Sequence, residues 1–445
     1  MRRVVKVSRI RIIITIIVVV LTTLLTGCTG KEPNEIAYVV ALGIDSTDDD
    51  NYKITIQYAN TTQISGGASE SGGKAGSEIV DNVTIEAPNI YAGVGLANNI
   101  VSKSFSMSHA KLIVFSKEIA EKGVKDMIET LVRSEEIRPD VFIAVANTTA
   151  NDYLTSVNPE MEVNPAQYYQ LIYQKNQLVG IPDGQLREFF TGLYTDNYDS
   201  IFPVAGVIEG SGGNSQNEGS EGSSESLDSF ESKSSNEKDE NEKEKDAEKN
   251  TSKYEYDIKN YVGGETAIEK KNKAEAIGAA VFEKDKMVGE LGEVETEICK
   301  MLKGDYTYSY LTYYNNDTPD IPITVKTTQQ KKPKYKIDTD KKTVDIELYI
   351  ESDLYSLPSD YNVENKIEDF ERDVANYTSS ACTEFINNFT KKYNSDILKL
   401  NEKVKYKFLT NNQYNWFKKN VGWSEYKFSV CTNFKVRRTG LIVRK

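Results

Sequence analysis

The 445-residue sequence predicts an α+β protein of several domains, in which mixed sheets pack against helices and a disordered acidic linker divides the chain. Helix and strand patterns alternate in the first half, hairpins and one long helix fill the second, and an almost wholly polar stretch separates them. The chain is also too long for a single core. The expected divisions are a signal peptide at 1–27, an N-terminal α+β domain at 28–208, the linker at 209–253, a β-rich middle domain at 254–330 and a C-terminal α+β domain with the long helix at 331–445.

The first 27 residues have the pattern of a bacterial lipoprotein signal peptide. Five basic residues precede an apolar run from Ile12 to Leu25, which at about 1.5 Å per residue reaches roughly 21 Å, less than a bilayer core of roughly 30 Å. Leu25-Thr26-Gly27-Cys28 follows as a lipobox, because its small residues admit a peptidase and the Cys28 thiol can carry a diacylglycerol. We therefore expect a mature chain that starts at Cys28 and works at a membrane surface. The alternative is a short membrane anchor with an incidental cysteine.

Charge and cysteine content exclude several classes. The formal net charge is −13 and becomes about −18 once the basic signal peptide is removed, which argues against nucleic acid or lipid headgroups as ligands of the body. The other cysteines, Cys299, Cys382 and Cys431, are odd in number and far apart. They predict neither a disulfide framework nor a metal site, and we expect all three to be buried.

The first half is expected to alternate strands and helices. Ile36–Asp45 and Tyr52–Tyr58 form a hairpin, in which Ile54, Ile56 and Tyr58 alternate toward a core. The later elements are a helix carrying Ile90, Val94, Ala97 and Val101, a strand at 110–115, a helix over 117–133 and a strand at 141–146. The two later strands are nearly all apolar, as expected where helices cover both faces of a sheet.

Three features of the first half resemble sites without meeting their requirements. The Asp48–Asn51 turn lacks the Gly and the closing Glu of an EF-hand, so a solvated turn is expected. The Gly-rich loop at 64–78 contains Gly72-Gly73-Lys74, but Ala68 and Ala75 stand where a phosphate-binding loop needs Gly and Ser or Thr. His109 is the only histidine, so no second imidazole is present for zinc, and we expect it to hydrogen-bond backbone at a strand end.

From 209 to 253 the chain holds thirteen acidic residues, six lysines and almost no apolar residue. Such a segment cannot bury enough surface to offset its chain entropy, so disorder is expected and the segment is interpreted as a spacer between independently folded parts.

The second half begins with a hairpin of 276–282 and 287–291, and a second hairpin spans 334–350. Between them lie Tyr306, Tyr308 and Tyr310, a stripe that would bind sugar or peptide or, alternatively, form a wet sheet face or an interdomain contact. A helix at 362–393 carries one long apolar stripe, a shorter helix lies near 395–401, and a last strand places Phe428, Val430, Phe434 and Val436 on one face.

Short motifs in a fixed order resemble the Ger(x)C family, the C subunits of spore germinant receptors. The match covers nearly the whole mature chain and departs in the acidic linker, in the Gly-rich loop and in the residues after Cys28. Its motifs are Cys28, Asn34–Ala37, Leu42–Asp45, Ser108–Lys111, Arg133 with Glu136–Arg138, Gly278–Phe282, Lys286–Gly289, Ser395–Asp396, Trp416, Trp423 and Arg438–Gly440.

The resemblance implies a lipoprotein on the outer face of the inner spore membrane, with the bilayer as partner through its acyl anchor. It further implies assembly with membrane-spanning A and B subunits in a complex that senses nutrients. No catalytic residue, cofactor or metal is expected, since the sequence has no nucleophile elbow or His-based dyad. The alternatives are an exported hydrolase or a solute-binding lipoprotein, and a nutrient ligand of this subunit is left open.

Overall fold

The computed structural model describes residues 13–17, 35–49, 51–59, 80–159, 162, 165–174, 180–195, 198–208, 260–266, 272–315, 318–356 and 366–439. Cys28, the Gly-rich loop and the predicted linker at 209–253 lie outside these residues. Within them, no helix has the length and apolar character needed to cross a membrane.

The first sheet has parallel strands at its centre and antiparallel strands at both ends. Its order is β3-β2-β1-β5-β6-β7-β8-β9, with the short β4 also paired to β1. The strands are β1 (Ile36–Ser46), β2 (Tyr52–Ala59), β3 (Val80–Ala87), β4 (Ser104–Ser106), β5 (Leu112–Ser116), β6 (Phe142–Ala146), β7 (Ser200–Val207), β8 (Ala274–Glu283) and β9 (Lys286–Leu291).

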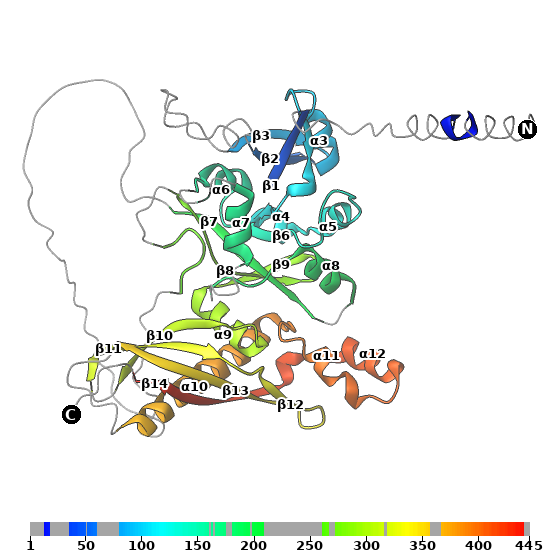
Figure 1. Ribbon diagram of the computed structural model, residues 1–445. Helices are drawn as coiled ribbons and strands as arrows, with labels where there is room; N and C mark the ends of the chain where they lie inside the picture. The colour runs from blue at the N-terminus through cyan, green and yellow to red at the C-terminus, as the bar shows by residue number, and fades with distance from the viewer. Residues whose placement is uncertain are drawn as a thin grey trace, which may run out of the picture.

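Helices cover both faces of this sheet, which explains why its central strands are apolar throughout (Figure 1). In β5, for example, Ile113 and Phe115 belong to one core and Leu112 and Val114 to the other. The helices of the first core are α3 (Ile90–Ala97), α4 (Lys117–Lys122), α5 (Lys125–Val132) and α8 (Leu186–Thr195), and those of the second are α6 (Ala150–Ser156) and α7 (Pro165–Gln174).

The helix predicted over 117–133 is wrong, because the structure divides it into α4 and α5. Gly123 follows α4 with φ +122° and ψ 138°, a conformation open essentially to glycine alone. A Cβ there would lie 2.7 Å from an oxygen of the Asp285 side chain, and the Val124 N–H donates to the Asp285 carbonyl at 3.0 Å. The break therefore seats this chain segment on the β8–β9 turn.

The second sheet has the order β10-β11-β13-β12, with β14 parallel to β13. The predicted hairpin at 334–350 is confirmed as β12–β13, and the hairpin of 276–282 and 287–291 is confirmed as β8–β9 of the first sheet. The predicted late strand is confirmed as β14, which pairs with β13. The strands are β10 (Tyr308–Asn315), β11 (Thr318–Gln329), β12 (Lys334–Asp338), β13 (Thr343–Ser356) and β14 (Lys427–Arg438).

The predicted long helix is confirmed as α10 (Ile367–Tyr393), and its polar side chains cover the free edge of β14. Asn387 accepts from the Phe428 N–H at 3.1 Å and donates to the Phe428 carbonyl at 3.0 Å. Farther along, Thr383 accepts from the Val430 N–H at 3.0 Å. Further acceptors along α10 are Ser379, for the N–H of Thr432, and Glu371, for the N–H of Val436. A helix thus satisfies donors that an exposed edge strand would leave open.

One helix joins the two sheets. α9 (Glu293–Lys303) lies between them in Figure 1. Its Cys299 and Leu302 share a core with Val281 of the first sheet and Ile346 of the second. The strands of the predicted middle segment, 254–330, are divided accordingly: β8 and β9 extend the first sheet, and β10 and β11 belong to the second. Two further helices, α11 (Leu400–Val404) and α12 (Asn411–Asn420), belong to the second half.

Candidate functional site

His109 stands at an exposed position before β5, at the end of a short 3-10 turn. Its Nδ1 lies 3.0 Å from the Ser108 hydroxyl, and its ring meets Tyr38 edge-on at 4.8 Å between centroids. Two residues farther on, the backbone of Lys111 pairs with neighbouring strands: its N–H donates to the Val40 carbonyl and its carbonyl accepts from the Phe142 N–H. His109 is therefore a surface side chain that packs locally, and its contacts with the Ser108 hydroxyl and the Tyr38 ring differ from the hydrogen bond to backbone that the sequence predicts.

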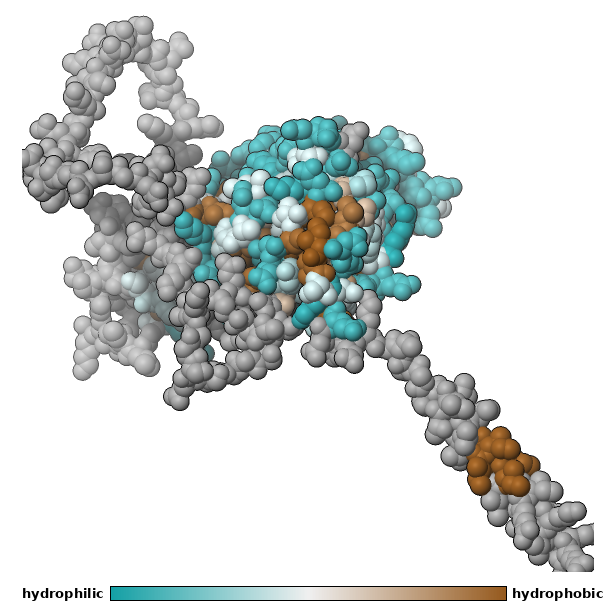
Figure 2. Space-filling view, turned by 90° about the horizontal axis from the view of Figure 1, so that it is seen from above, coloured by the Kyte–Doolittle hydropathy of each residue, from teal (hydrophilic) through white to brown (hydrophobic). Residues whose placement is uncertain are grey.

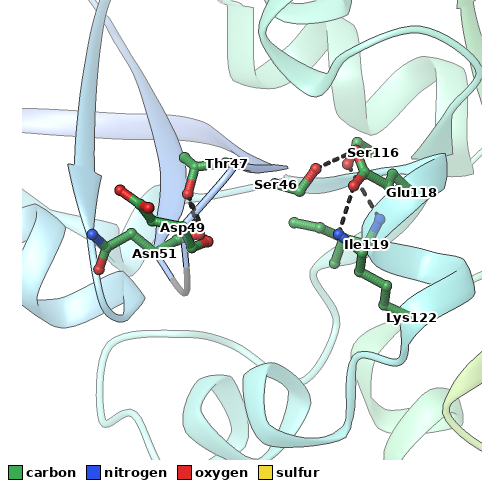
Figure 3. A network of polar contacts seen from close by, with 8 residues as sticks. All are labelled: Ser46, Thr47, Asp49, Asn51, Ser116, Glu118, Ile119 and Lys122. Carbon is green, nitrogen blue, oxygen red and sulfur yellow. Dashed lines mark hydrogen bonds and ion pairs between the residues drawn. The ribbon is translucent and has the colours of Figure 1, made fainter.

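The acidic turn between β1 and β2 is held by its own backbone (Figure 3). The Thr47 hydroxyl donates to the carbonyls of Asp49 at 3.1 Å and Asn51 at 2.8 Å. In the same view, the Glu118 carboxylate accepts from the Ser46 hydroxyl and from Lys122, which holds the pKa of Glu118 below its usual range. Among the residues with described positions, no group of three or more His, Cys, Asp or Glu is placed to hold a metal ion.

Asp45 occupies the edge where ligands bind in many open α/β sheets, the carboxyl ends of the parallel strands. Its two carboxylate oxygens accept from the N–H groups of Ala150 at 2.6 Å and Asn151 at 3.0 Å. Because these are the first donors of α6, the place that could hold an anion is already filled by a side chain of the protein. The motif residue Asp45 is thus a connector between strand and helix.

The tyrosine stripe is not a continuous surface. Tyr306 is buried, and its hydroxyl is hydrogen-bonded to Thr327 and, at 3.2 Å, to Glu297. Tyr310 is 53% exposed and meets the ring of Tyr355 edge-on at 5.5 Å. This division matches a partly wet sheet face better than a flat platform for sugar stacking.

Asp199 and Asp396 clasp the two halves of the molecule together. The Asp396 N–H donates to Asp199 Oδ2 at 2.9 Å, and the Asp199 N–H donates to the Asp396 carbonyl at 3.2 Å. The Asp396 carboxylate also caps α11 by accepting from Leu400 at 2.6 Å and Asn401 at 2.8 Å. Burial raises the pKa of Asp396 to about 7, although these backbone N–H groups act to lower it.

A hollow of about 560 Å³ lies beside this clasp, between the first-sheet side and α12. Lys418 of α12 donates to the Thr195 carbonyl at the end of α8 at 3.4 Å, a hydrogen bond between the two halves beside the hollow. The lining is polar and carries both signs of charge: Gly192, Tyr198, Asp199, Glu283, Lys284, Asp396, Asn401, Asn415, Lys418 and Lys419.

A second hollow, of about 350 Å³, contains three lysines and three carboxylates, namely Lys300, Lys303, Lys399, Asp183, Glu188 and Asp305. Lys300 donates to the Ile181 carbonyl at 3.0 Å, and burial lowers its pKa to about 8. Burial also raises the pKa values of Asp183 and Glu188. Paired charges in a half-enclosed hollow are suited to binding a small polar molecule or a polar protein segment. We call the two hollows and the aspartate clasp the junction site.

The sequence predicted little of this site. The sequence indicates Asp396 only as part of a family motif, and no pattern in it marks Asp199 or the lysines of α9. Asp199 and Asp396 are 197 residues apart, so no local pattern marks them as partners. Cys28, the one site residue that the sequence predicts, lies outside the described residues, and its lipidation stays a prediction.

Comparisons with known proteins bear on both halves of the chain. The family model of the spore germination protein N-terminal domain matches residues 30–207, and that described as spore germination B3/GerAC like, C-terminal, matches residues 277–440.

Among curated proteins, the chain is 26% identical over 174 residues to spore germination protein KC of Bacillus subtilis strain 168, which covers 36% of this chain and 42% of that one. It is 26% identical over 148 residues to spore germination protein B3 of the same organism, covering 31% and 36%. The chain thus spans less than half the length of these relatives. The crystal structure of the GerBC protein matches with 15% identity and a TM-score of 0.48, covering 89% of this chain and 96% of that one.

Proposed function

Because the chain belongs to the Ger(x)C family of germinant receptor C subunits, we propose that it is a lipid-anchored, non-catalytic subunit of a nutrient germinant receptor, required for spore germination. The observation that carries this proposal is the match of both family domains, in order, to the two halves of one chain. The homologous proteins are germinant receptor subunits and are not known as enzymes.

The membrane part of the proposal rests on Cys28. A lipobox with a basic, apolar leader places a thioether-linked diacylglycerol on this thiol, and two or three acyl chains hold a protein on a bilayer durably. The location that follows is the outer face of the inner spore membrane.

Assembly with the membrane-spanning A and B subunits is the proposed working state. A non-catalytic subunit acts through its surfaces, and the junction site offers polar hollows with lysines and carboxylates from both halves. Such a surface can bind a charged segment of a partner. Because residues of both halves line the hollows, a conformational change in the bound partner would act on both sheets together.

Anchoring is tested by Cys28→Ala. The variant should accumulate as an uncleaved precursor without acyl mass, whereas Cys431→Ser, which removes a thiol elsewhere on the surface, should be processed normally. Mass spectrometry of the N-terminal peptide and detergent partitioning give the result. Acyl mass on the Cys28→Ala protein would refute the anchor.

The receptor role is tested in spores. Deletion of the mature body in a strain that lacks related receptors should abolish or slow germination with one set of nutrients, while germination that bypasses receptors proceeds. An unchanged nutrient response would count against the receptor role.

The alternative, an exported solute-binding lipoprotein, is favoured by one observation, the hollow with paired lysines and carboxylates. Titration calorimetry of the mature chain with free amino acids tests it, with Lys303→Gln as the variant. Two results together would favour the alternative: an amino-acid affinity that Lys303→Gln lowers at least about tenfold, and normal germination of spores that lack the mature body.

A further inference from the structure

The last residues of α3 and the turn after it expose two large aliphatic side chains. Leu96 is 46% exposed and Ile100 is 67% exposed. Beneath them Ile90, Val94 and Ala97 are buried in the first core, so the turn sits on a fixed base. It is also tied to the sheet, because Asn98 Oδ1 accepts from the Phe105 N–H at 2.8 Å. We call residues 96–103 the α3 turn.

The α3 turn lies where the N-terminal segment enters the body. β1 and β4 are parallel, and Ile36 pairs with Ser104. Glu35 and Lys103, which immediately precede these partners, therefore leave the same edge of the sheet side by side. α3 is at the top of the body in Figure 1, and Figure 2, seen from that side, shows apolar side chains exposed on this face among hydrophilic ones.

The length of chain to Cys28 limits how far this edge can be from a bilayer. Glu35 is the seventh residue after Cys28, and seven fully extended residue steps span at most roughly 25 Å. An acyl anchor on Cys28 would thus hold the edge that carries the α3 turn close to the lipid surface.

The segment that contains the α3 turn has fewer acidic residues than the chain as a whole. Of the 67 acidic residues none lies between 87 and 117, a stretch that contains Lys103, Lys111 and Lys117. An anionic bilayer repels the acidic body in general but does not repel this stretch, where cationic residues are attracted. Three carboxylates reach this edge from other segments. Glu35 directly precedes β1, the Glu136 carboxylate accepts from the Met107 N–H at 2.6 Å, and Asp81 acts on Tyr58, whose ring contacts Phe105. Apolar contact therefore carries more of the interaction than charge.

We propose that the α3 turn is a membrane-contact element, in which Leu96 and Ile100 insert into the bilayer interface and fix the orientation of the anchored body. The proposal rests on the proposed anchoring at Cys28. A single tether leaves a body free to tumble, whereas a tether with a second, apolar contact on the same edge holds one face toward the lipid.

The test places a fluorescent probe on the turn. The full-length lipidated protein carries Cys431→Ser, so that its other free thiols are the buried Cys299 and Cys382, and Ile100→Cys accepts an NBD-maleimide. It is reconstituted into phosphatidylglycerol and phosphatidylethanolamine vesicles with and without doxyl-labelled lipid. The matched control is Leu409→Cys, at a leucine 95% exposed just before α12 in the other half of the molecule.

We expect quenching by doxyl lipid to be at least about threefold stronger at position 100 than at position 409, with a blue-shifted emission at position 100 only. Equal, weak quenching at both positions would overturn the proposal. Quenching that appears at position 100 only after the membrane subunits are added would identify a protein-docking face and would equally overturn the bilayer contact.

A second arm separates this proposal from the anchoring itself. The mature chain with a hexahistidine tag directly before residue 29 is attached to vesicles by nickel-chelating lipid, which reproduces the tether without acylation. If the native protein fails to float with vesicles, the anchoring proposal is refuted. The nickel-tethered protein still decides the α3 turn, by the same comparison of positions 100 and 409.

Discussion

Glu297 illustrates how burial determines the chemistry of single residues in this protein. It lies at a small, mainly apolar cavity of about 130 Å³ between α9, α10 and β10, where it accepts from the Tyr306 hydroxyl at 3.2 Å. Burial raises its pKa to about 7, against the lowering effect of the hydroxyls of Ser309 and Tyr306. A protonated carboxyl is therefore favoured by the fold at mildly acidic pH.

Glu297→Gln should remove part of the pH dependence of stability. Because the folded pKa exceeds the unfolded value, the folded state binds more protons between about pH 4.5 and 7, and stability falls as pH rises through this window. The loss from this one group is on the order of 2–3 kcal/mol. Denaturant titrations at pH 5 and pH 8 should show a smaller difference for Glu297→Gln than for the wild type.

Glu384→Gln controls for the loss of one carboxylate, since Glu384 is exposed on α10. Parallel pH profiles for the wild type and Glu297→Gln would show that Glu297 is not held in a raised-pKa state.

The cysteines contradict one expectation from the sequence. Cys299 and Cys382 are buried as predicted, but Cys431 is exposed. The reason is the period-two pattern of β14, in which Phe428, Val430 and Phe434 face the core and the residues between them face outward. Burial raises the pKa of Cys299 to about 11 and that of Cys382 to about 12, so neither forms a thiolate readily.

Brief treatment of the native mature chain with a maleimide should therefore modify Cys431 only. Intact-protein mass spectrometry should show one adduct within residues 29–445 of the folded protein and three after denaturation. The folded Cys431→Ser variant should show no adduct in these residues. Modification of Cys299 or Cys382 at a comparable rate would mean that the core around α9 and α10 opens easily.

At the scale of elements, a clear period made an element predictable. The alternating strands β2 and β13 and the stripe of α10 were found from the sequence, with errors at their ends. Between 147 and 208 the sequence has no clear period and predicts no element, although β7, α6, α7 and α8 lie there. The core face of α7 consists of Tyr168, Tyr169 and Tyr173, whose burial depends on hydroxyl partners such as Gln57, 2.5 Å from the Tyr169 hydroxyl. From the sequence alone, tyrosines do not indicate a buried face, because their burial depends on hydrogen-bond partners for the hydroxyl groups.

Asn387→Ala tests the pairing of α10 with the edge of β14. The substitution leaves both the N–H and the carbonyl of Phe428 without their partner, which should cost about 1–3 kcal/mol. Asn388→Ala, at an exposed position one residue along the same helix, should change stability by less than about 0.5 kcal/mol. Thermal unfolding gives the difference, and hydrogen exchange should show faster exchange of β14 amides in Asn387→Ala alone. Equal effects of the two substitutions would mean that water replaces Asn387 at no cost.

At the scale of the whole molecule, the connection from 208 to 273 joins neighbouring strands of one sheet. β7 and β8 pair antiparallel, and Val207 stands opposite Ala274, so the two ends of the connection meet. The sequence indicates the polar segment at 209–253 but not this pairing, because the register depends on contacts between two distant segments. The first sheet is thus built from both sides of the connection, so the expectation that 209–253 separates independently folded parts is wrong. The second sheet is joined to the first by α9 and the Asp199–Asp396 clasp.

Limited proteolysis should cut first within 209–253 and leave two fragments that stay together. Composition predicts a disordered, accessible segment, while the β7–β8 pairing and the shared cores hold both fragments in one body. Denaturing electrophoresis should show two pieces, and size-exclusion chromatography should show one.

Removing ten to fifteen residues of the segment should lower the free energy of unfolding by well under about 1 kcal/mol, because closure entropy changes slowly with loop length. A variant with 209–253 replaced by a short Gly-Ser linker is the control and should resist cleavage without losing stability. Fragments that separate on the column would contradict the pairing, and loss of germination in the shortened but folded protein would show that the segment binds a partner.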